Sequence, residues 1–213
     1  MNAVAGKFTP PDDAEVTRLV REYPLAWVVT AHDGDFGATL LPIRPFHDAQ
    51  GRLTELHGHF ARSNSQVEAI RRNPRALFLF LGPHGYVSPS WLTDRTQAPT
   101  WNYASAQFVV DIEFIEDESR MEALMRDLVG AVEAGRERAW SIDDMGPRYT
   151  RLVRGVIGFH ARIRDARVKF KLGQDERDEN YAEIIQGLAG NLDAELSQWM
   201  SRCNPNRPKV TDD

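Results

Sequence analysis

The fold is decided by ALFLFLGPHGYVSPSWLTDRTQAPTWNY, residues 76–103. This stretch opens with six apolar residues and turns at Gly82 and Pro83, a pattern typical of a strand that is buried on both faces. A loop rich in aromatic side chains follows, stiffened by Pro89 and Pro99. Because ordering a loop costs about 1–2 kcal/mol per residue, this loop must pack on a core, on a second subunit or on a flat ligand.

The length and composition indicate a soluble, cytoplasmic protein. A chain of 213 residues can bury a full core, and we expect one domain over residues 1–203 followed by a flexible tail at 204–213. The net charge of −5 argues against tight, non-specific binding of nucleic acid. Cys203 is the single cysteine, so no intrachain disulfide can form, as is usual in a reducing cytoplasm. Neither a secretory signal nor an apolar run of membrane-spanning length is visible.

Runs of β-branched and apolar residues bounded by turn signals predict the strands. Three successive strands with short turns between them, one of which contains Asp33, indicate an antiparallel meander over residues 25–30, 36–41 and 53–60. Further strands are predicted at 76–81, 106–115, 156–164 and 168–172.

Helical spacing and capping residues predict the helices. Capping boxes at Asp12 and Ser65 begin two short helices, and Ser119 caps the helix that the spacing of apolar residues over 121–132 predicts. A helical pattern also covers 178–202, with a break at Gly190 and Asn191. Six or seven strands with helices between and after them predict an α+β barrel or sandwich.

Common catalytic motifs are absent, including glycine-rich nucleotide loops, nucleophile elbows and paired-cysteine metal sites. His57 and His59 share one strand face and His84 is a possible third ligand, but no carboxylate follows them at ligand spacing. We therefore predict no metal site. The histidines more simply orient a loop or pack.

The turn from His59 to Ser65 passes from a strand into a helix. The guanidinium of Arg62, the hydroxyl of Ser63 and the amide of Asn64 converge there with exposed N–H groups, a combination that suits a phosphate. Alternatively, Asn64 and Ser65 only cap the helix and Arg62 is solvated.

Residues 148–171 form a basic block in an acidic chain, with eight cationic side chains and one acid. Within it, Lys169 and Lys171 share a strand face at a separation of roughly 7 Å. The block could meet nucleic acid, a ligand phosphate or the acidic segment 175–183, or be a solvated face. The aromatic residues Trp91, Trp101 and Tyr103 could stack on a planar ring or, more simply, form a dimer seam.

Several separated blocks of this sequence resemble the PaiB-like family: GHFARSNSQ (58–66), GPHGYVSPSW (82–91), PTWNYASA (99–106), VIGFHARI (156–163) and KFKLGQDERD (169–178). The resemblance implies an antiparallel, six- to seven-stranded split barrel that binds FMN, similar in architecture to pyridoxamine-phosphate oxidase and flavin reductases. In that architecture two subunits share a seam in which FMN lies. Some members are described as negative regulators of protease production and sporulation.

The resemblance also implies cofactor contacts. The turn contributes His59, Ala61, Arg62, Ser63 and Asn64, and the second strand places Thr39 and Leu40 near the isoalloxazine ring. Trp91, Trp101 and Asn102 would lie at the seam, while Lys169, Lys171 and Gln174 would reach the phosphate or the ring. Gly173 and Asp175 stand where the family usually has serine and asparagine, and an acid beside the cofactor weakens the binding of an anion.

Two functions from different classes follow from this resemblance. The first is an FMN-binding, dimeric negative regulator of transcription, although direct DNA binding has little support because no helix-turn-helix with a basic recognition face is visible. The alternative is an FMN-dependent oxidoreductase or flavin reductase, whose chemistry would reside in the cofactor. A barrel that has lost its cofactor and serves as a scaffold is the third reading.

Overall fold

The computed structural model describes residues 6–32, 34–190 and 194–207, so the predicted turn residue Asp33, the break at Asn191 and the tail from residue 208 lie outside the described residues. The chain divides into two compact units. Unit 1 contains Met1–Glu22, Leu81–Ala106 and Arg167–Asp213, and unit 2 contains Tyr23–Phe80 and Gln107–Ala166. No helix in the described ranges is long and apolar enough to cross a membrane.

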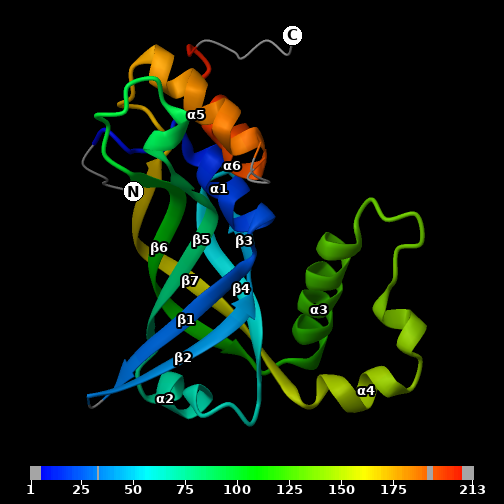
Figure 1. Ribbon diagram of the computed structural model, residues 1–213. Coiled ribbons are helices and arrows are strands. Elements are labelled where there is room, and N and C mark those ends of the chain that lie inside the picture. Colours follow the sequence, from blue (N-terminus) through cyan, green and yellow to red (C-terminus); the bar gives the residue numbers. More distant parts are fainter. Residues whose placement is uncertain (1–5, 33, 191–193, 208–213) are drawn as a thin grey trace. The chain divides into compact units, whose positions relative to one another are not determined.

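Seven strands form one sheet in the order β2-β1-β5-β6-β7-β4-β3 (Figure 1). The strands that belong to unit 2 alone are β1 (Leu25–His32), β2 (Asp35–Pro42), β3 (Arg44–His47) and β4 (Leu53–Ala61). The long strands β5 (Arg75–Val87), β6 (Thr100–Ile115) and β7 (Val156–Lys171) contribute residues to both units. Each strand pair of recorded register is antiparallel. The predicted three-stranded meander is wrong in its third strand, because β4 pairs with β3 and β7 and is not next to β2 in the sheet.

The core of unit 2 is aromatic. Phe78 packs edge-on against Phe159 at a ring-centroid distance of 5.9 Å, and Phe159 in turn contacts Phe60 at 5.3 Å. Phe80 and Phe108 form a second edge-on pair at 5.7 Å. All five rings are fully buried or nearly so. Pairs of this kind contribute about 0.5–1.5 kcal/mol each beyond the area that they bury, so they fix the inner face of the sheet.

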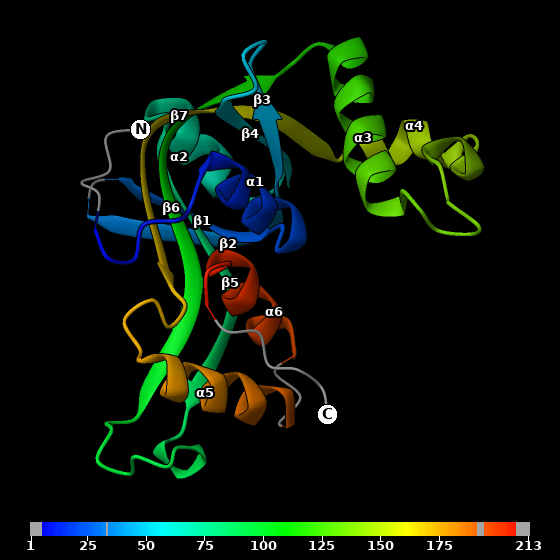
Figure 2. The ribbon, with the colours of Figure 1, turned by 90° about the horizontal axis from the view of Figure 1, so that it is seen from above.

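The helices of unit 2 are α2 (Gln66–Arg72), α3 (Glu118–Glu133) and α4 (Arg148–Val153), with a short 3-10 turn at Ile142–Met145. Figures 1 and 2 show α3 and α4 beside each other, joined by the segment that contains this turn. Met121 and Leu124 of α3 lie against β7 at Gly158, where a Cβ atom would be 2.5 Å from Leu124 Cδ2. A side chain at Gly158 would therefore push α3 away from the sheet.

Unit 1 is organised around helices α1 (Asp13–Glu22), α5 (Asp178–Gly190) and α6 (Ala194–Cys203). The indole of Trp199 donates to Glu22 over 3.0 Å, and Arg202 donates to Glu15 over 3.1 Å, so α1 and α6 are held together by two charge-assisted hydrogen bonds. The ring of Phe170 lies 5.6 Å from that of Trp199 and is fully buried.

The structure corrects the predicted strands in three places. The strand that contains Phe78 and Phe80 alternates between buried and more exposed positions, so it is not buried on both faces. Trp101 and Asn102, predicted to lie in a loop, belong to β6, which begins at Thr100. The two strands predicted at 156–164 and 168–172 are one continuous strand, β7.

Two predicted helix caps are wrong, although both helices form. Ser65 makes no capping hydrogen bond, because Asn64 accepts from the N–H of Gln66 instead. At the start of α3 the cap is Asp117, which accepts from the N–H of Arg120 over 2.9 Å, and the hydroxyl of Ser119 donates to the same carboxylate.

Candidate functional site

A buried glutamine joins three elements at one corner of unit 2. Gln66, at the start of α2, is 4% exposed, and its amide donates to Val28 O and to Thr30 Oγ1 of β1, over 3.0 Å in each case. Its side-chain oxygen accepts from the hydroxyl of Thr39 on β2, and the amide of Asn64 donates to that hydroxyl over 2.9 Å. The structure thus brings together Thr39 and Asn64, two of the predicted cofactor-binding residues.

Several backbone N–H groups of the turn that follows β4 already have acceptors. The N–H of Arg62 donates to Gly155 O over 2.9 Å, and the N–H of Asn64 donates to Ala61 O over 3.0 Å. Asn64 Oδ1 accepts from the N–H of Gln66. These N–H groups are therefore not available to a phosphate, and α2 has only seven residues. An anion at this turn would have to be held by side chains or by the other N–H groups.

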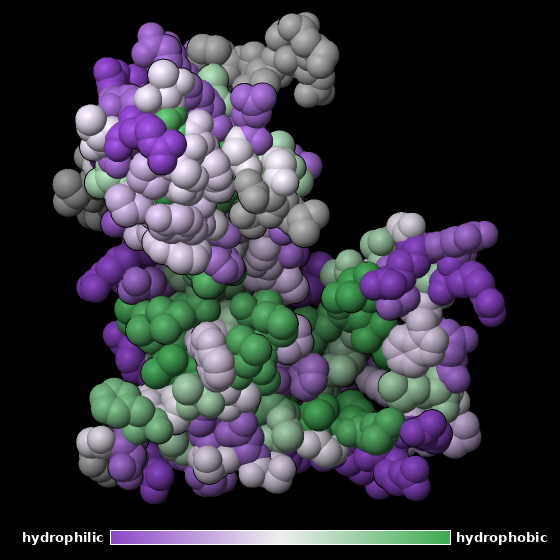
Figure 3. Space-filling view, viewed as in Figure 1, coloured by the Kyte–Doolittle hydropathy of each residue, from purple (hydrophilic) through white to green (hydrophobic). Residues whose placement is uncertain are grey.

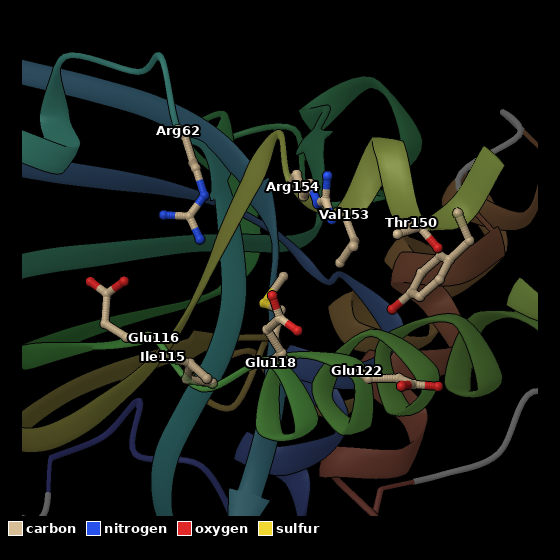
Figure 4. A pocket seen from close by; sticks show the side chains of 10 residues that line it. Arg62, Ile115, Glu116, Glu118, Glu122, Thr150, Val153 and Arg154 are labelled. Atoms are coloured by element: carbon tan, nitrogen blue, oxygen red, sulfur yellow. The ribbon is translucent and has the colours of Figure 1, made fainter. Parts of the chain in front are cut away.

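Arg62 reaches into a pocket of about 200 Å³. Figure 4 shows its guanidinium entering from the end of β4, with glutamates along the start of α3 and residues of α4 on the other side. The pocket is lined by Arg62, Ile115, Glu116, Glu118, Met121, Glu122, Tyr149, Thr150, Val153 and Arg154. Its volume suits the phosphate end of a nucleotide rather than a whole flavin.

Ion pairs offset two of the three glutamates that line this pocket, whereas Glu118 has no ion pair recorded among the described residues. Glu116 pairs with Arg71 at 2.7 Å, and Glu122 pairs with Arg126 at 2.8 Å, so both glutamate charges are offset by arginines that do not line the pocket. Among the described residues, neither Arg62 nor Arg154 has an ion-pair partner. Two guanidinium groups at one pocket can bind an oxyanion with several charge-assisted hydrogen bonds, and the carboxylate of Glu118 in the same lining acts against the anion.

Tyr149 adds a buried hydroxyl to this pocket. Its Oη atom is shielded from solvent and has no hydrogen-bond partner among the described residues. Burial raises the pKa of this phenol, with Glu122 acting in the same direction, so the hydroxyl stays protonated and can donate. A buried donor without a partner is costly, and a ligand oxygen in the pocket would satisfy it.

His59, near the end of β4, also has an unpartnered polar atom. Its Nδ1 atom is buried and makes no hydrogen bond within the described ranges. Burial lowers the pKa of His59, so the ring is neutral near pH 7. A neutral imidazole can either donate or accept at Nδ1, depending on its tautomer.

The two strands that contribute Thr30 and Thr39 to this corner, β1 and β2, also carry exposed apolar side chains. Trp27 of β1 and Leu40 of β2 are opposite each other in register and are 50% and 44% exposed, and Phe36 of β2 is 80% exposed. Figure 3 shows hydrophobic side chains gathered on the side of the molecule where β1 and β2 lie. Exposed aromatic and aliphatic side chains concentrated on two paired strands are typical of a surface that binds a partner.

Five other predicted cofactor-binding residues lie in unit 1. The ammonium of Lys169 lies over the rings of Phe8 and Tyr103, at 5.4 and 5.7 Å from their centroids. Lys171 donates to the hydroxyl of Thr100 and to Trp101 O. Both ammonium groups are therefore held by groups of unit 1.

The remaining predicted residues of unit 1 take three different positions. Gln174 closes a turn, accepting from the N–H of Leu172 and donating to Phe170 O. Asn102 is buried, with its amide against Met200 Sδ, whereas Trp101 is exposed and meets only the edge of Tyr86. Asp175, the departure from the family pattern, pairs with Lys7 at 2.6 Å.

Sequence reasoning missed several residues of the site. From the sequence, Gln66 belongs only to a predicted capping box. A single sequence does not reveal that the side-chain amide of this residue, at the start of a helix, is buried against two strands. Tyr149 and Arg154 lie about 90 residues after Arg62 and meet it through tertiary packing alone. Trp91, predicted at a subunit seam, packs on α5 at Gly187, where a Cβ atom would be 2.5 Å from the indole ring.

The fold defines a class of protein, an α+β split barrel. Two solved structures share the fold. The FAD and heme binding protein from Mycobacterium smegmatis has a TM-score of 0.58 and 20% identity, and the match covers 83% of this chain and 80% of that one. A flavocytochrome from Azotobacter vinelandii has a TM-score of 0.60 and 16% identity, and the match covers 80% of this chain and 73% of that one.

The sequence itself gives the family. Residues 4–165 match the family described as "Putative FMN-binding domain", and the chain belongs to that family, which makes FMN its cofactor. The chain is also 29% identical over 182 residues to the protease synthase and sporulation protein PAI 2 of Bacillus subtilis, covering 85% of this chain and 86% of that protein. The PaiB-like resemblance predicted from the sequence blocks is thereby confirmed.

Proposed function

We propose that this chain binds FMN with the phosphate at Arg62 and Arg154 and works as a homodimer that regulates protease production and sporulation. One observation carries the phosphate assignment: two guanidinium groups without ion-pair partners among the described residues line one pocket. Their charges, with the unpartnered hydroxyl of Tyr149, match the oxygens of a phosphate monoester.

The groups around the turn after β4 fit the rest of the cofactor. The isoalloxazine ring carries hydrogen-bonding atoms on its edge and apolar faces, which suit the unpartnered Nδ1 of His59, the hydrogen-bonded pair of Thr39 and Asn64, and the exposed side chain of Leu40. Ala61 and Ser63 are the other residues of this turn that we propose to contact FMN. FMN supplies hydride and electron transfer when it is bound. The chain would bind the ring, orient it and exclude water from one side.

The partner we infer for the apolar face of β1 and β2 is a second copy of this chain. The face consists of paired strands with exposed Trp27, Phe36 and Leu40, and the sequence places Leu40 directly after the proposed flavin ligand Thr39. A dimer formed there would cover the apolar face and the proposed ring site together. Sedimentation should give a dimer that Leu40→Glu converts to a monomer. Val132→Glu, at an exposed position of α3, should stay dimeric.

Regulation is the role that the Bacillus subtilis relative supports, since its name refers to protease synthesis and sporulation. The basic block 148–171 is the segment that the sequence offers for direct DNA contact, whereas the net charge of −5 favours an indirect route. Mobility shifts at physiological salt should therefore be absent. The buried free Cys203 is in keeping with a cytoplasmic location.

An oxidoreductase or flavin reductase is the second candidate, and the unpartnered imidazole of His59 favours it, because a neutral ring can exchange a proton with a bound substrate. Oxidation of a nicotinamide cofactor by the FMN-loaded protein, lost in His59→Gln, would favour this function. Lys169, Lys171, Gln174, Trp101 and Asn102 remain proposed cofactor contacts from the sequence resemblance, as does the single domain over 1–203.

The test of the phosphate assignment compares FMN with riboflavin, which lacks the phosphate. The native protein should bind FMN at least about tenfold more tightly, because hydrogen bonds to charged groups contribute about 1.5–3 kcal/mol. Arg62→Gln and Arg154→Gln should remove most of that preference and leave riboflavin binding unchanged. Arg72→Gln, an exposed arginine of α2, is the matched control. Equal affinities for the two flavins in the native protein would refute the assignment.

A further inference from the structure

A second cluster of chemically competent side chains lies in unit 2, on the sheet formed by β4 and β7. Glu55 Oε2 is 3.0 Å from His57 Nε2 and 4.0 Å from His160 Nδ1, and the three ligand atoms all lie within 4.8 Å of one another. Neither the flavin site nor any predicted contact uses this cluster. It therefore requires its own explanation.

Strand geometry brings these three residues together. Glu55 and His57 are two positions apart on β4 and so point to the same face of the sheet. His160 is the direct cross-strand partner of His57 in the antiparallel pairing of β4 with β7. Directly opposed residues have Cβ atoms about 4.5–5.5 Å apart, so one ion can reach ligands from both strands.

The donor set is that of a transition-metal site. Two imidazoles and one carboxylate are the ligands that zinc takes, with ligand bonds of about 2.0–2.2 Å and therefore ligand atoms about 3.3 Å apart in a tetrahedron. The observed separations of 3.0 and 4.0 Å bracket that value.

The rings need a small adjustment to share an ion. His57 and His160 are stacked with centroids 4.2 Å apart and an interplanar angle of 13°, so their in-plane lone pairs lie in parallel planes. Rotation of one ring about its Cβ–Cγ bond points both lone pairs at one position, and this torsion is broad for histidine. His57 is 8% exposed and stacks on Phe46, whereas His160 is half-buried.

An open groove of about 450 Å³ borders the cluster and leaves room for further ligands. Glu113 also lines this groove and adds a carboxylate to its walls. Arg120 and Arg162 also line the groove and have no ion-pair partner in the described part of the chain. They would balance an anionic ligand on the ion.

We propose that Glu55, His57 and His160 bind one divalent transition-metal ion of the zinc class, with an open coordination position that faces the groove beside β7. The site is separate from the flavin pocket, because the two share no lining residue. A site with three protein ligands and an open position is the arrangement that zinc has where it contacts a substrate or water.

The test titrates chelator-treated, full-length protein with Zn²⁺ by isothermal calorimetry. We expect one ion per chain, and an affinity reduced at least about 100-fold in His160→Gln and in Glu55→Gln, since even outer-shell changes cost 10–100-fold. Glu55→Gln is isosteric and Glu55 is only half-buried, so the variant should fold. His84→Gln, a histidine of unit 1, and Cys203→Ser are the controls and should bind as the native chain does.

Co²⁺ gives a second readout that does not depend on heat. Binding at the cluster should produce the visible absorption of a four- or five-coordinate ion, and His57→Gln should abolish it. The proposal is overturned if the native chain binds no Zn²⁺ at micromolar concentration. It is equally overturned if the cluster variants and His84→Gln bind the ion alike, which would indicate adventitious surface histidines.

Discussion

Replacement of Gln66 by leucine tests how the flavin corner is held together. The substitution keeps the volume of the side chain but removes its two hydrogen bonds to β1, each 3.0 Å long, and the acceptor of the Thr39 hydroxyl. Thr30 is buried and loses its side-chain partner. The variant therefore replaces a satisfied polar network by unpartnered groups.

Three hydrogen bonds at about 0.5–1.5 kcal/mol each, with the desolvated Thr30 hydroxyl left unpaired, predict a loss of about 2–4 kcal/mol in the free energy of unfolding. Urea unfolding at equilibrium measures it, as a lower midpoint with an unchanged slope. The affinity for FMN should fall as well, because Asn64 and Thr39 lose the group that positions them.

The control is Gln107→Leu, which replaces an exposed glutamine of β6 by leucine. It should change the free energy of unfolding by less than about 0.5 kcal/mol. In the double variant with Thr39→Val the two losses should not add, because both remove the same hydrogen bond. A loss of less than about 1 kcal/mol in Gln66→Leu would show that the network does not hold this corner.

Three further predictions concern single residues. Burial lowers the pKa of His59 below its value in the unfolded chain, so the unfolded chain binds more protons at mildly acidic pH. The free energy of unfolding should therefore fall as the pH is lowered from about 7.5 to about 5.5, and its slope against pH should be smaller in His59→Gln. Burial raises the pKa of Cys203 to about 12, so a chromogenic thiol reagent should react at least about 100-fold more slowly with the native than with the urea-unfolded chain; equal rates would contradict this. A Cβ at Gly158 would be 2.5 Å from Leu124 Cδ2, so Gly158→Ala should cost about 1–3 kcal/mol in thermal unfolding, whereas Gly130→Ala, with open space around it, should be neutral or stabilising.

The sequence predicted the elements that local patterns determine. The helix expected over 121–132 is α3, because apolar residues at helical spacing have no other way to reach one core. The alternation of β5 was misread, because Leu77 and Leu79 are as apolar as buried residues although they are only partly buried in the chain by itself. Composition cannot distinguish a strand face that is buried within the chain from one that is buried only when a partner binds.

The same limit applies to the sites. The turn after His59 could be predicted because its residues are adjacent in sequence, and the structure adds that several of its N–H groups already have acceptors. His160 could not be assigned to a site, because only the register of β4 and β7 determines which residues it meets, and Arg154 meets the pocket of Arg62 through tertiary packing alone. The pair Glu55 and His57 was the available signal for the metal cluster, since ligands two positions apart share a strand face.

The most direct test of the account is the visible absorption spectrum of the purified protein during titration with FMN, read together with its sedimentation. The account predicts a perturbed flavin spectrum that saturates at one FMN per chain in a dimer, and a much weaker response in Arg62→Gln. A spectrum of free FMN throughout the titration, at concentrations where the chain is folded, would contradict it.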